Sequence, residues 1–176
     1  MSLVRDKTAK DEAWVREFLR ERWGGVVMAV HGEAIDASLC PALVAGAREG
    51  LAAYRMLSDE EAELVSLNAV TPGRGIGTAL INALAARCSQ RGAKRIWVTT
   101  TNANLRGLRF YQCRGFRLMR LRPGAVDEAR RIKLSIPLVS DEGIPIRDEL
   151  DLCRDVNFKS AIHALWHHRL GRSPSQ

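Results

Sequence analysis

The feature that most constrains this chain is a glycine-rich turn between an apolar segment and a helical one. Residues 63–70 are mostly apolar with imperfect alternation, which is typical of a central strand covered on both faces. Pro72 and Gly73 end this strand, and apolar residues at helical spacing run from Ile76 until Gly92 ends the helix. A strand that enters a helix in this way leaves several backbone N–H groups unpaired near one point, and such a point attracts phosphate.

Two common phosphate-binding loops do not fit this turn. A Walker loop ends in Lys followed by Ser or Thr, whereas Gly77 is followed by Thr78 and Ala79. The dinucleotide-binding fingerprint requires a third glycine and, about 20 residues further on, an acidic residue. Leu80 and Trp97 stand at those positions, so this type of loop is a poor match as well.

The turn resembles the acyl-CoA-binding motif of the GNAT superfamily of N-acetyltransferases, Gln/Arg-x-x-Gly-x-Gly/Ala, which aligns with residues 72–77. Pro72 departs from the usual Gln or Arg, which affects one side-chain contact to the pyrophosphate and leaves the backbone donors in place. A second segment reproduces the superfamily pattern Asn-x-x-Ala-x-x-Phe-Tyr-x-x-x-Gly-Phe through Asn104, Gly107 (for Ala), Phe110, Tyr111, Gly115 and Phe116. The two motifs stand in the superfamily's order, with a strand at residues 94–101 between them, and the resemblance covers roughly residues 40–120.

The resemblance implies the GNAT acyl-CoA N-acyltransferase fold, an α/β (α+β) architecture. Its central sheet is mixed, mostly antiparallel, has about six to seven strands and is flanked by helices. The implied activity is transfer of an acetyl group from acetyl-CoA to a primary amine by direct attack in a ternary complex, without a metal. The alternative is a non-catalytic acyl-CoA-binding or nucleic-acid-associated module with the same fold. We expect one domain over residues 1–154, followed by a helical extension and a frayed tail over 155–176.

The resemblance also implies which residues bind acetyl-CoA. The oxyanion donor is expected to be a backbone N–H near Ala69 or Val70, where a bulge widens the splayed end of the strand. Asn104 matches a cofactor-contacting asparagine, although Asn is equally a favoured helix N-cap. The expected phosphate-loop residues are Arg74, Gly75, Ile76, Gly77 and Thr78.

Two side chains are candidates for proton transfer, since acyl transfer to an amine requires removal of the amine proton and protonation of the departing sulfur. Tyr111 matches the superfamily's general acid, and a phenol with a reference pKa of about 10 can protonate a thiolate whose pKa is about 8.5. The alternative is that Tyr111 only packs in the core beside Phe110. Glu63 matches the position of a general base; Glu60 and Glu61 compete with it, and all three are also explained as surface carboxylates.

Composition excludes several functional classes. The net charge is +7, but the arginines are dispersed, so we expect them to serve the anionic CoA rather than nucleic acid. The four cysteines form no C-x-x-C pair, which favours reduced thiols over disulfides or a zinc site. No apolar window approaches the length of a membrane span. These features predict a cytoplasmic protein, and the superfamily makes a homodimer possible. The arginines within or beside the two motifs are Arg74, Arg87, Arg91, Arg106, Arg109 and Arg114.

The acceptor pocket is the least readable part, and we expect residues 26–41 and 121–152 to form it. His31, Glu33 and Asp36 are able to face an amine, although a polar surface loop over 31–41 is the simpler interpretation. His163 and His167 have metal-ligand spacing, but a solvated helix face explains them better. The remaining expected elements are a helix at 11–23, a strand at 26–30, a hairpin of 43–45 with 51–57, a strand at 116–121, a helical turn at 126–132, a strand at 144–152 and a helix from Asp155.

Overall fold

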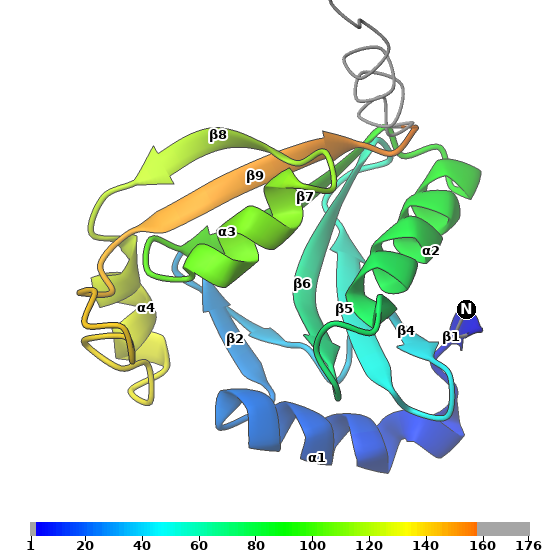
Figure 1. Ribbon diagram of the computed structural model, residues 1–176, viewed down its shortest axis with the longest axis horizontal. Coiled ribbons are helices and arrows are strands. Elements are labelled where there is room, and N and C mark those ends of the chain that lie inside the picture. The colour runs from blue at the N-terminus through cyan, green and yellow to red at the C-terminus, as the bar shows by residue number, and fades with distance from the viewer. Residues whose placement is uncertain (1–2, 158–176) are drawn as a thin grey trace, which may run out of the picture.

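A seven-stranded sheet with the strand order β1-β4-β5-β6-β7-β9-β8 forms the centre of the computed structural model, which describes residues 3–157 (Figure 1). Only β6 and β7 are parallel, and every other neighbouring pair is antiparallel. The predicted mixed, mostly antiparallel sheet is therefore confirmed. In sheet order, the strands are β1 (Val4–Asp6), β4 (Ala42–Ala45), β5 (Gly50–Met56), β6 (Glu61–Ala69), β7 (Arg95–Thr101), β9 (Glu149–Asp155) and β8 (Arg117–Arg122).

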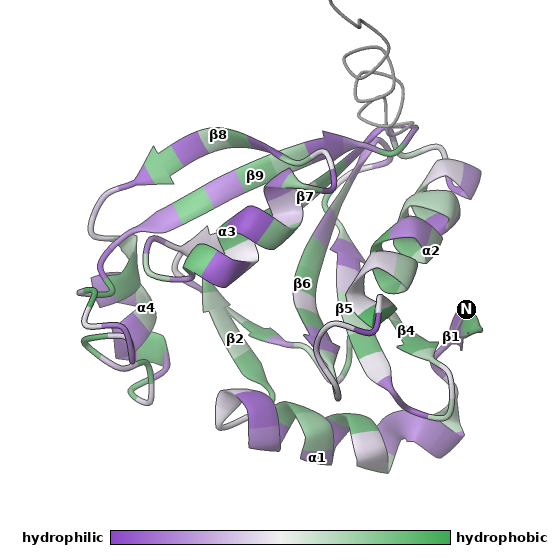
Figure 2. Ribbon diagram, in the orientation of Figure 1, coloured by the Kyte–Doolittle hydropathy of each residue, from purple (hydrophilic) through white to green (hydrophobic). Residues whose placement is uncertain are grey.

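Helices cover both faces of this sheet. The long helix α2 (Ile76–Gln90) connects β6 to β7 and lies on one face together with α3 (Leu105–Gln112). Helix α1 (Glu12–Trp23) follows the short 3-10 turn η1 (Ala9–Asp11) and packs on the opposite face, turning its apolar residues toward the strands (Figure 2). As predicted, α1 ends at a glycine, since Gly24 adopts the left-handed conformation at its C-cap.

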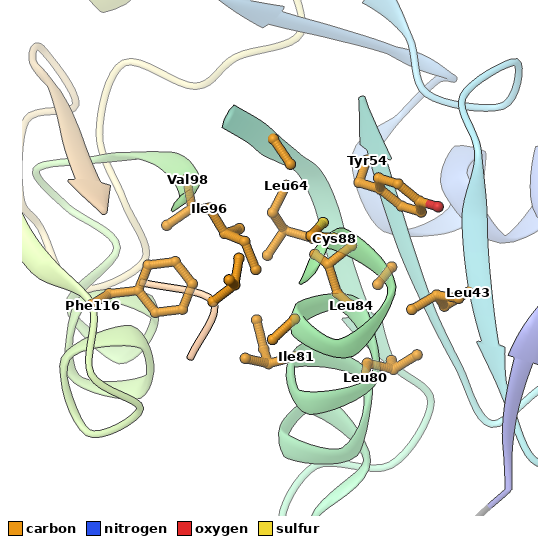
Figure 3. Packing of buried hydrophobic residues seen from close by; sticks show 14 of the residues in the cluster. Leu43, Tyr54, Leu64, Leu80, Ile81, Leu84, Cys88, Ile96, Val98 and Phe116 are labelled. Carbon is orange, nitrogen blue, oxygen red and sulfur yellow. The ribbon is translucent and has the colours of Figure 1, made fainter. Parts of the chain in front are cut away.

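The main core lies between α2 and the sheet. Four residues of α2, at helical spacing, point toward the strands: Leu80, Ile81, Leu84 and Cys88 (Figure 3). They meet side chains that come from alternate positions of the strands, namely Leu43, Tyr54, Leu64, Ile96 and Val98. Because residues that alternate along a strand face opposite sides, the intervening residues of β6 and β7 point to the α1 side of the sheet.

Strands β6 and β7 diverge along their length (Figure 1). Their pairing ends at Leu64 and Val98, although β6 continues to Ala69 and β7 to Thr101. A bulge lies on β6, because Ala53 pairs with Ser66 while Tyr54 pairs with Leu64, which leaves Val65 as the extra residue. The bulge was expected near Ala69 or Val70 and instead stands at the point where the two strands part.

A second, two-stranded sheet replaces part of the expected loop at residues 31–41. Strand β2 (Val27–Val30) pairs with β3 (Glu33–Asp36), and residues 31 and 32 form the turn. His31 and Gly32 have φ angles of 53° and 75°. Two positive φ angles in a two-residue loop define the hairpin turn that matches strand twist, and the non-glycine at its first position hid this turn from the sequence analysis.

The ends of the chain also differ from expectation. Strand β1 was not predicted, and the last strand is β9 rather than residues 144–152. Asp155 was expected to begin a helix, but it ends β9, and Val156 is buried in the main core. Two polar side chains of β9, those of Glu149 and Asp151, belong to the site described below. Helix α4 (Ala125–Ile132) matches the expected helical turn, whereas His163 and His167 lie outside the described residues.

Candidate functional site

The glycine-rich turn presents unpaired backbone donors at the start of α2. Gly73 and Gly75 have φ angles of 82° and 76°, and Gly75 is the N-cap. The first helical hydrogen bond runs from the Ala79 N–H to the Gly75 carbonyl oxygen at 3.0 Å. The N–H groups of Ile76, Gly77 and Thr78 therefore have no carbonyl partner within the helix and converge at its positive end.

Packing against α3 fixes the position of this turn. A Cβ atom on Gly77 would lie 2.9 Å from Cζ of Phe110, so only glycine allows the ring to lie this close to α2. Arg114 completes the contact: its guanidinium carbon lies 3.6 Å from the centre of the Phe110 ring, and Nε and Nη2 donate to the Thr78 hydroxyl at 2.8 and 2.7 Å. Burial lowers the pKa of Arg114. Within residues 3–157, the hydrogen bonds of Arg114 go to neutral oxygens, so a cation lies beside the glycine-rich turn.

Arg74, the predicted loop cation, is largely exposed and lies 3.8 Å from a carboxylate oxygen of Glu49. That surface pair is weak, so the side chain can turn toward an anion in the loop.

The two candidate oxyanion donors differ in the structure. The Val70 N–H donates to the Glu49 carbonyl oxygen on the β5 side at 2.8 Å, so it is already engaged. Gly50 and Ala69 are opposite each other in the same ladder. Because N–H groups alternate in direction along an antiparallel strand, those of Ala69 and Leu67 point away from β5 into the gap beside β7. The Val70 N–H is therefore engaged, whereas Ala69 retains a donor that faces the gap.

Tyr111 lies on the α2 face. Its ring meets Phe110 and Phe116 edge to face, with centroids 5.3 and 5.4 Å away. Burial raises the pKa of its phenol, so the hydroxyl stays protonated near neutral pH.

Asn104 caps α3. Its side-chain oxygen accepts a hydrogen bond from the Gly107 N–H at 2.9 Å, and its amide nitrogen donates to the Thr100 hydroxyl at 2.8 Å. These contacts correspond to the capping role that the sequence left open beside a cofactor contact.

Glu63 lies on the opposite face of the sheet from Tyr111 and lines a cavity of about 200 Å³. Its carboxylate is 4% exposed and accepts a hydrogen bond from Nε of Arg55 at 2.6 Å. Arg55 also donates to Glu33 at 2.8 Å, so one guanidinium joins two carboxylates. The cavity is lined by His31, Arg55, Leu57, Glu61, Glu63, Trp97, Thr99, Arg120, Arg122 and Asp151.

The other two carboxylates that were considered as bases are engaged at the surface. Glu60 pairs with Lys94, and Glu61 lies 3.6 Å from Arg95. Glu61 also contributes to the cavity wall, whereas Glu60 does not.

A hydrogen-bonded cluster that sequence reasoning did not identify completes the cavity. Nε2 of His31 lies 2.7 Å from Oδ1 of Asp151 and 3.1 Å from the Thr99 hydroxyl. The other oxygen of Asp151 accepts from Nε of Arg122 at 2.9 Å. His31 and Asp151 are 120 residues apart in the chain, so no local motif links them. The signal available in the sequence was the polar character of the segment that forms β9.

The pKa values of two buried carboxylates of β9, Asp151 and Glu149, are shifted in opposite directions. Burial by itself would raise the pKa of Asp151, but hydrogen bonds from His31, Arg122 and Thr99 outweigh it and lower that pKa. Burial raises the pKa of Glu149, which accepts a hydrogen bond from the His31 N–H at 3.2 Å. Asp151 is thus held as an anion beside the imidazole.

Trp97 adds an unused donor to the cavity. Its Nε1 is buried and has no hydrogen-bond acceptor within residues 3–157. A buried donor of this kind requires a partner, and water or a bound molecule can supply one. Within the same residues, no group of three His, Cys, Asp or Glu side chains is arranged to hold a metal ion. None of the helices described there has the length and apolar character needed to cross a membrane.

Comparison with known proteins places these features in a family. The model of the acetyltransferase (GNAT) family matches residues 48–116, which contain β6, the glycine-rich turn and Tyr111. The chain is 45% identical over 107 residues to the uncharacterized protein YxbD of Bacillus subtilis, covering 61% of this chain and 67% of YxbD. It is 33% identical over 138 residues to the uncharacterized protein YdhI of the same organism, covering 76% of this chain and 86% of YdhI.

Solved structures share the fold. A GNAT family acetyltransferase from Elizabethkingia anophelis with acetyl-CoA bound superposes with a TM-score of 0.62 over 88% of this chain and 97% of its own, at 16% sequence identity. At that identity the likeness describes the architecture alone.

Proposed function

Because the chain belongs to the acetyltransferase (GNAT) family, we propose that it transfers the acetyl group of acetyl-CoA to a primary amine. The observation that carries the proposal is the gap between β6 and β7, which opens where the bulge at Val65 stands and continues past Leu64 and Val98. Beyond Leu64, the edge of β6 that faces β7 is unpaired within residues 3–157, and the pantetheine arm can hydrogen-bond to this edge as an additional strand would. The pyrophosphate then reaches the N–H groups at the start of α2.

In this proposal, the reacting thioester lies in the gap, between Tyr111 on the α2 face and the cavity on the α1 face. The Ala69 N–H points into the gap and supports the developing oxyanion. Tyr111, on the α2 face, protonates the departing sulfur. The amine enters from the cavity on the α1 face, where Glu63 is the base predicted from the family pattern and Trp97 offers a free donor. Holding the two reactants together in a ternary complex supplies much of the rate enhancement.

The solved relative named above contains acetyl-CoA, which supports acetyl-CoA as the donor here. Arg114 and Arg74 supply positive charge beside the loop, and Pro72 removes only one side-chain contact. The four cysteines are free, which supports a reducing compartment such as the cytoplasm. A homodimer stays a prediction that sedimentation can test.

The experiment is calorimetric titration of acetyl-CoA into wild type and Tyr111→Phe, with thiol release measured over a panel of primary amines. We expect equal binding of acetyl-CoA by the two proteins and turnover slowed by roughly 10²-fold or more in the variant. A wild type that binds acetyl-CoA but acetylates no amine would favour the alternative of a non-catalytic acyl-CoA-binding module. Absence of binding would contradict both.

A further inference from the structure

We propose that His31, oriented by Asp151, is the group that accepts the proton of the acceptor amine. This inference rests on the proposed amine acetylation and assigns to His31 the role that the family pattern gives to Glu63. It is carried by the position of the His31 ring, by its hydrogen bonds and by the contrasting surroundings of Glu63.

The His31 ring lies at the point where the sheet opens. Thr99, which is 3.1 Å from Nε2 of His31, is the first residue of β7 beyond the last pair with β6. Glu63 pairs with Trp97, which precedes Thr99 by two positions on β7, so Glu63 lies inside the region where β6 and β7 are paired. Of the two candidate bases, His31 is therefore the one adjacent to the gap that would hold the thioester.

The hydrogen bonds define which nitrogen of His31 is available. A neutral imidazole has one donor and one acceptor nitrogen. Since Asp151 is held as an anion 2.7 Å from Nε2, the proton belongs on Nε2 and the lone pair on Nδ1. The side chain is 28% exposed, so a substrate or a bridging water can reach it. The remaining charges near the ring or on the cavity walls are Glu33, Glu149, Glu61, Glu63, Arg55, Arg120 and Arg122.

The backbone also holds His31 in place. Its φ of 53° belongs to the hairpin turn, and Glu149 accepts a hydrogen bond from its N–H. A non-glycine residue in this conformation is strained, and such strain persists where the surrounding contacts enforce it. Here two buried carboxylates of β9, Glu149 and Asp151, hold the tip of the β2–β3 hairpin at the cavity through hydrogen bonds with His31.

Glu63 is less suited to accept a proton. Its carboxylate is almost fully buried and bonds to Arg55 at 2.6 Å. Protonation of Glu63 would remove its negative charge, so Arg55 would then be paired with the carboxylate of Glu33 only. We therefore assign Glu63 a positioning role, in which it holds Arg55 at the cavity wall.

The amine nitrogen attacks the thioester carbonyl carbon, the C–N bond forms, and the amine proton moves to Nδ1 of His31 directly or through one water. The C–S bond then breaks with its electron pair on sulfur, which takes a proton from Tyr111. Exchange with solvent returns a proton to Tyr111 and removes one from His31, so the products are the amide and free CoA.

The decisive variant is His31→Gly, because glycine suits the positive φ and leaves room for an added imidazole. We expect acetyl-CoA affinity within about twofold of wild type and turnover of the best amine reduced by roughly 10²-fold or more. Added imidazole should raise the turnover of His31→Gly at least about tenfold. The matched control is Ala34→Gly, an exposed position of the same hairpin, which should keep wild-type turnover and show no response to imidazole. Glu63→Gln should lose turnover without rescue by imidazole.

The proposal is overturned if imidazole leaves His31→Gly unchanged, because a residue that only fastens the hairpin cannot be replaced by free imidazole. A second measurement does not depend on activity: ¹⁵N NMR of the histidine rings, with the His31 signals assigned by their loss in His31→Gly. In the neutral ring we expect a protonated Nε2 and a bare Nδ1, whereas a neutral ring with its proton on Nδ1 would contradict the inference. If wild type acetylates no amine, the proposed function fails, and the NMR result still decides the state of His31.

Discussion

Asp11 shows how a single residue stabilises the N-terminal part of the fold. The residue is 1% exposed and accepts two hydrogen bonds from Arg5, at 2.7 and 2.9 Å. The backbone N–H and the hydroxyl of Thr8 donate to the same carboxylate at 3.0 and 2.9 Å. The hydrogen bonds from Arg5, opposed in part by burial, hold the pKa of Asp11 well below its usual range. Asp11 is the N-cap residue of α1, but its side chain makes no capping hydrogen bond to that helix and instead joins β1 to the turn before α1.

Asp11→Asn should lower the free energy of unfolding at pH 7 by roughly 1–3 kcal/mol. Because the folded-state pKa lies below the unfolded value of about 3.9, the contribution of Asp11 is fully present above about pH 5 and is lost as pH falls toward the folded pKa. Urea unfolding of both proteins at pH 7, 5 and 3 measures this difference. A difference in the free energy of unfolding between wild type and variant that is the same at all three pH values would contradict this account of Asp11.

At the residue scale, local motifs that resemble the family pattern proposed the glycine-rich turn and Tyr111 as site residues, because the spacing of these motifs is fixed within one strand–helix unit. They did not locate His31, since its partner Asp151 comes from the far end of the chain and the two meet only through the pairing of β9 with β7. Likewise, the sequence offered Ala69 and Val70 equally, and only the direction of each N–H in the ladder separates them.

At the scale of elements, the contact between α2 and α3 links the phosphate loop to Tyr111. Gly77→Ala should push the Phe110 ring, whose Cζ would lie 2.9 Å from the new Cβ, and thereby displace α3. We expect weaker acetyl-CoA binding and a loss of stability of about 1–3 kcal/mol from overpacking. Calorimetric titration of acetyl-CoA and thermal unfolding measure the two effects.

The second substitution Phe110→Leu, added to Gly77→Ala, should recover part of the affinity because it removes the clashing ring. The control is Gly25→Ala, since a Cβ there meets no atom within 4 Å and its φ is ordinary. Equal effects of Gly77→Ala and Gly25→Ala would show that the contact with Phe110 does not determine the geometry of the loop.

Element prediction succeeded where periodicity was strong and failed where turns decide the outcome. The strand–turn–helix unit and the β4–β5 hairpin follow from apolar patterns and glycine positions. Strand β3 was not predicted because a histidine occupies a left-handed position in its turn. Strand β9 was predicted at 144–152 instead of Glu149–Asp155, because its polar residues face a site rather than a core.

At the scale of the whole molecule, two apolar clusters lie on opposite faces of one sheet. Leu84 belongs to the α2 cluster and Leu19 to the α1 cluster, and both are fully buried. Strands β4 and β5 contribute to both clusters, so neither face can unfold alone without exposing the other. The overall class was predictable because two motifs resemble those of a family with a known fold, whereas the packing of the two faces depends on contacts between distant segments.

Leu84→Ala and Leu19→Ala should each lower the free energy of unfolding by about 2–5 kcal/mol. Both variants should keep a single transition with an unchanged dependence on urea. Circular dichroism and tryptophan fluorescence, to which Trp14 in α1 and Trp97 at the cavity contribute, should give coincident curves. Separate transitions for the two probes would show that the two faces unfold independently.

The most direct measurement of the central claim follows thiol release from acetyl-CoA together with the mass of the amine in the same reaction. We predict one thiol released for each amine acetylated, a rate that saturates in both substrates with intersecting double-reciprocal plots, and no acetyl group left on the protein. Thiol release that leaves every amine unmodified, or an acetylated protein with parallel plots, would contradict direct attack by an amine in a ternary complex.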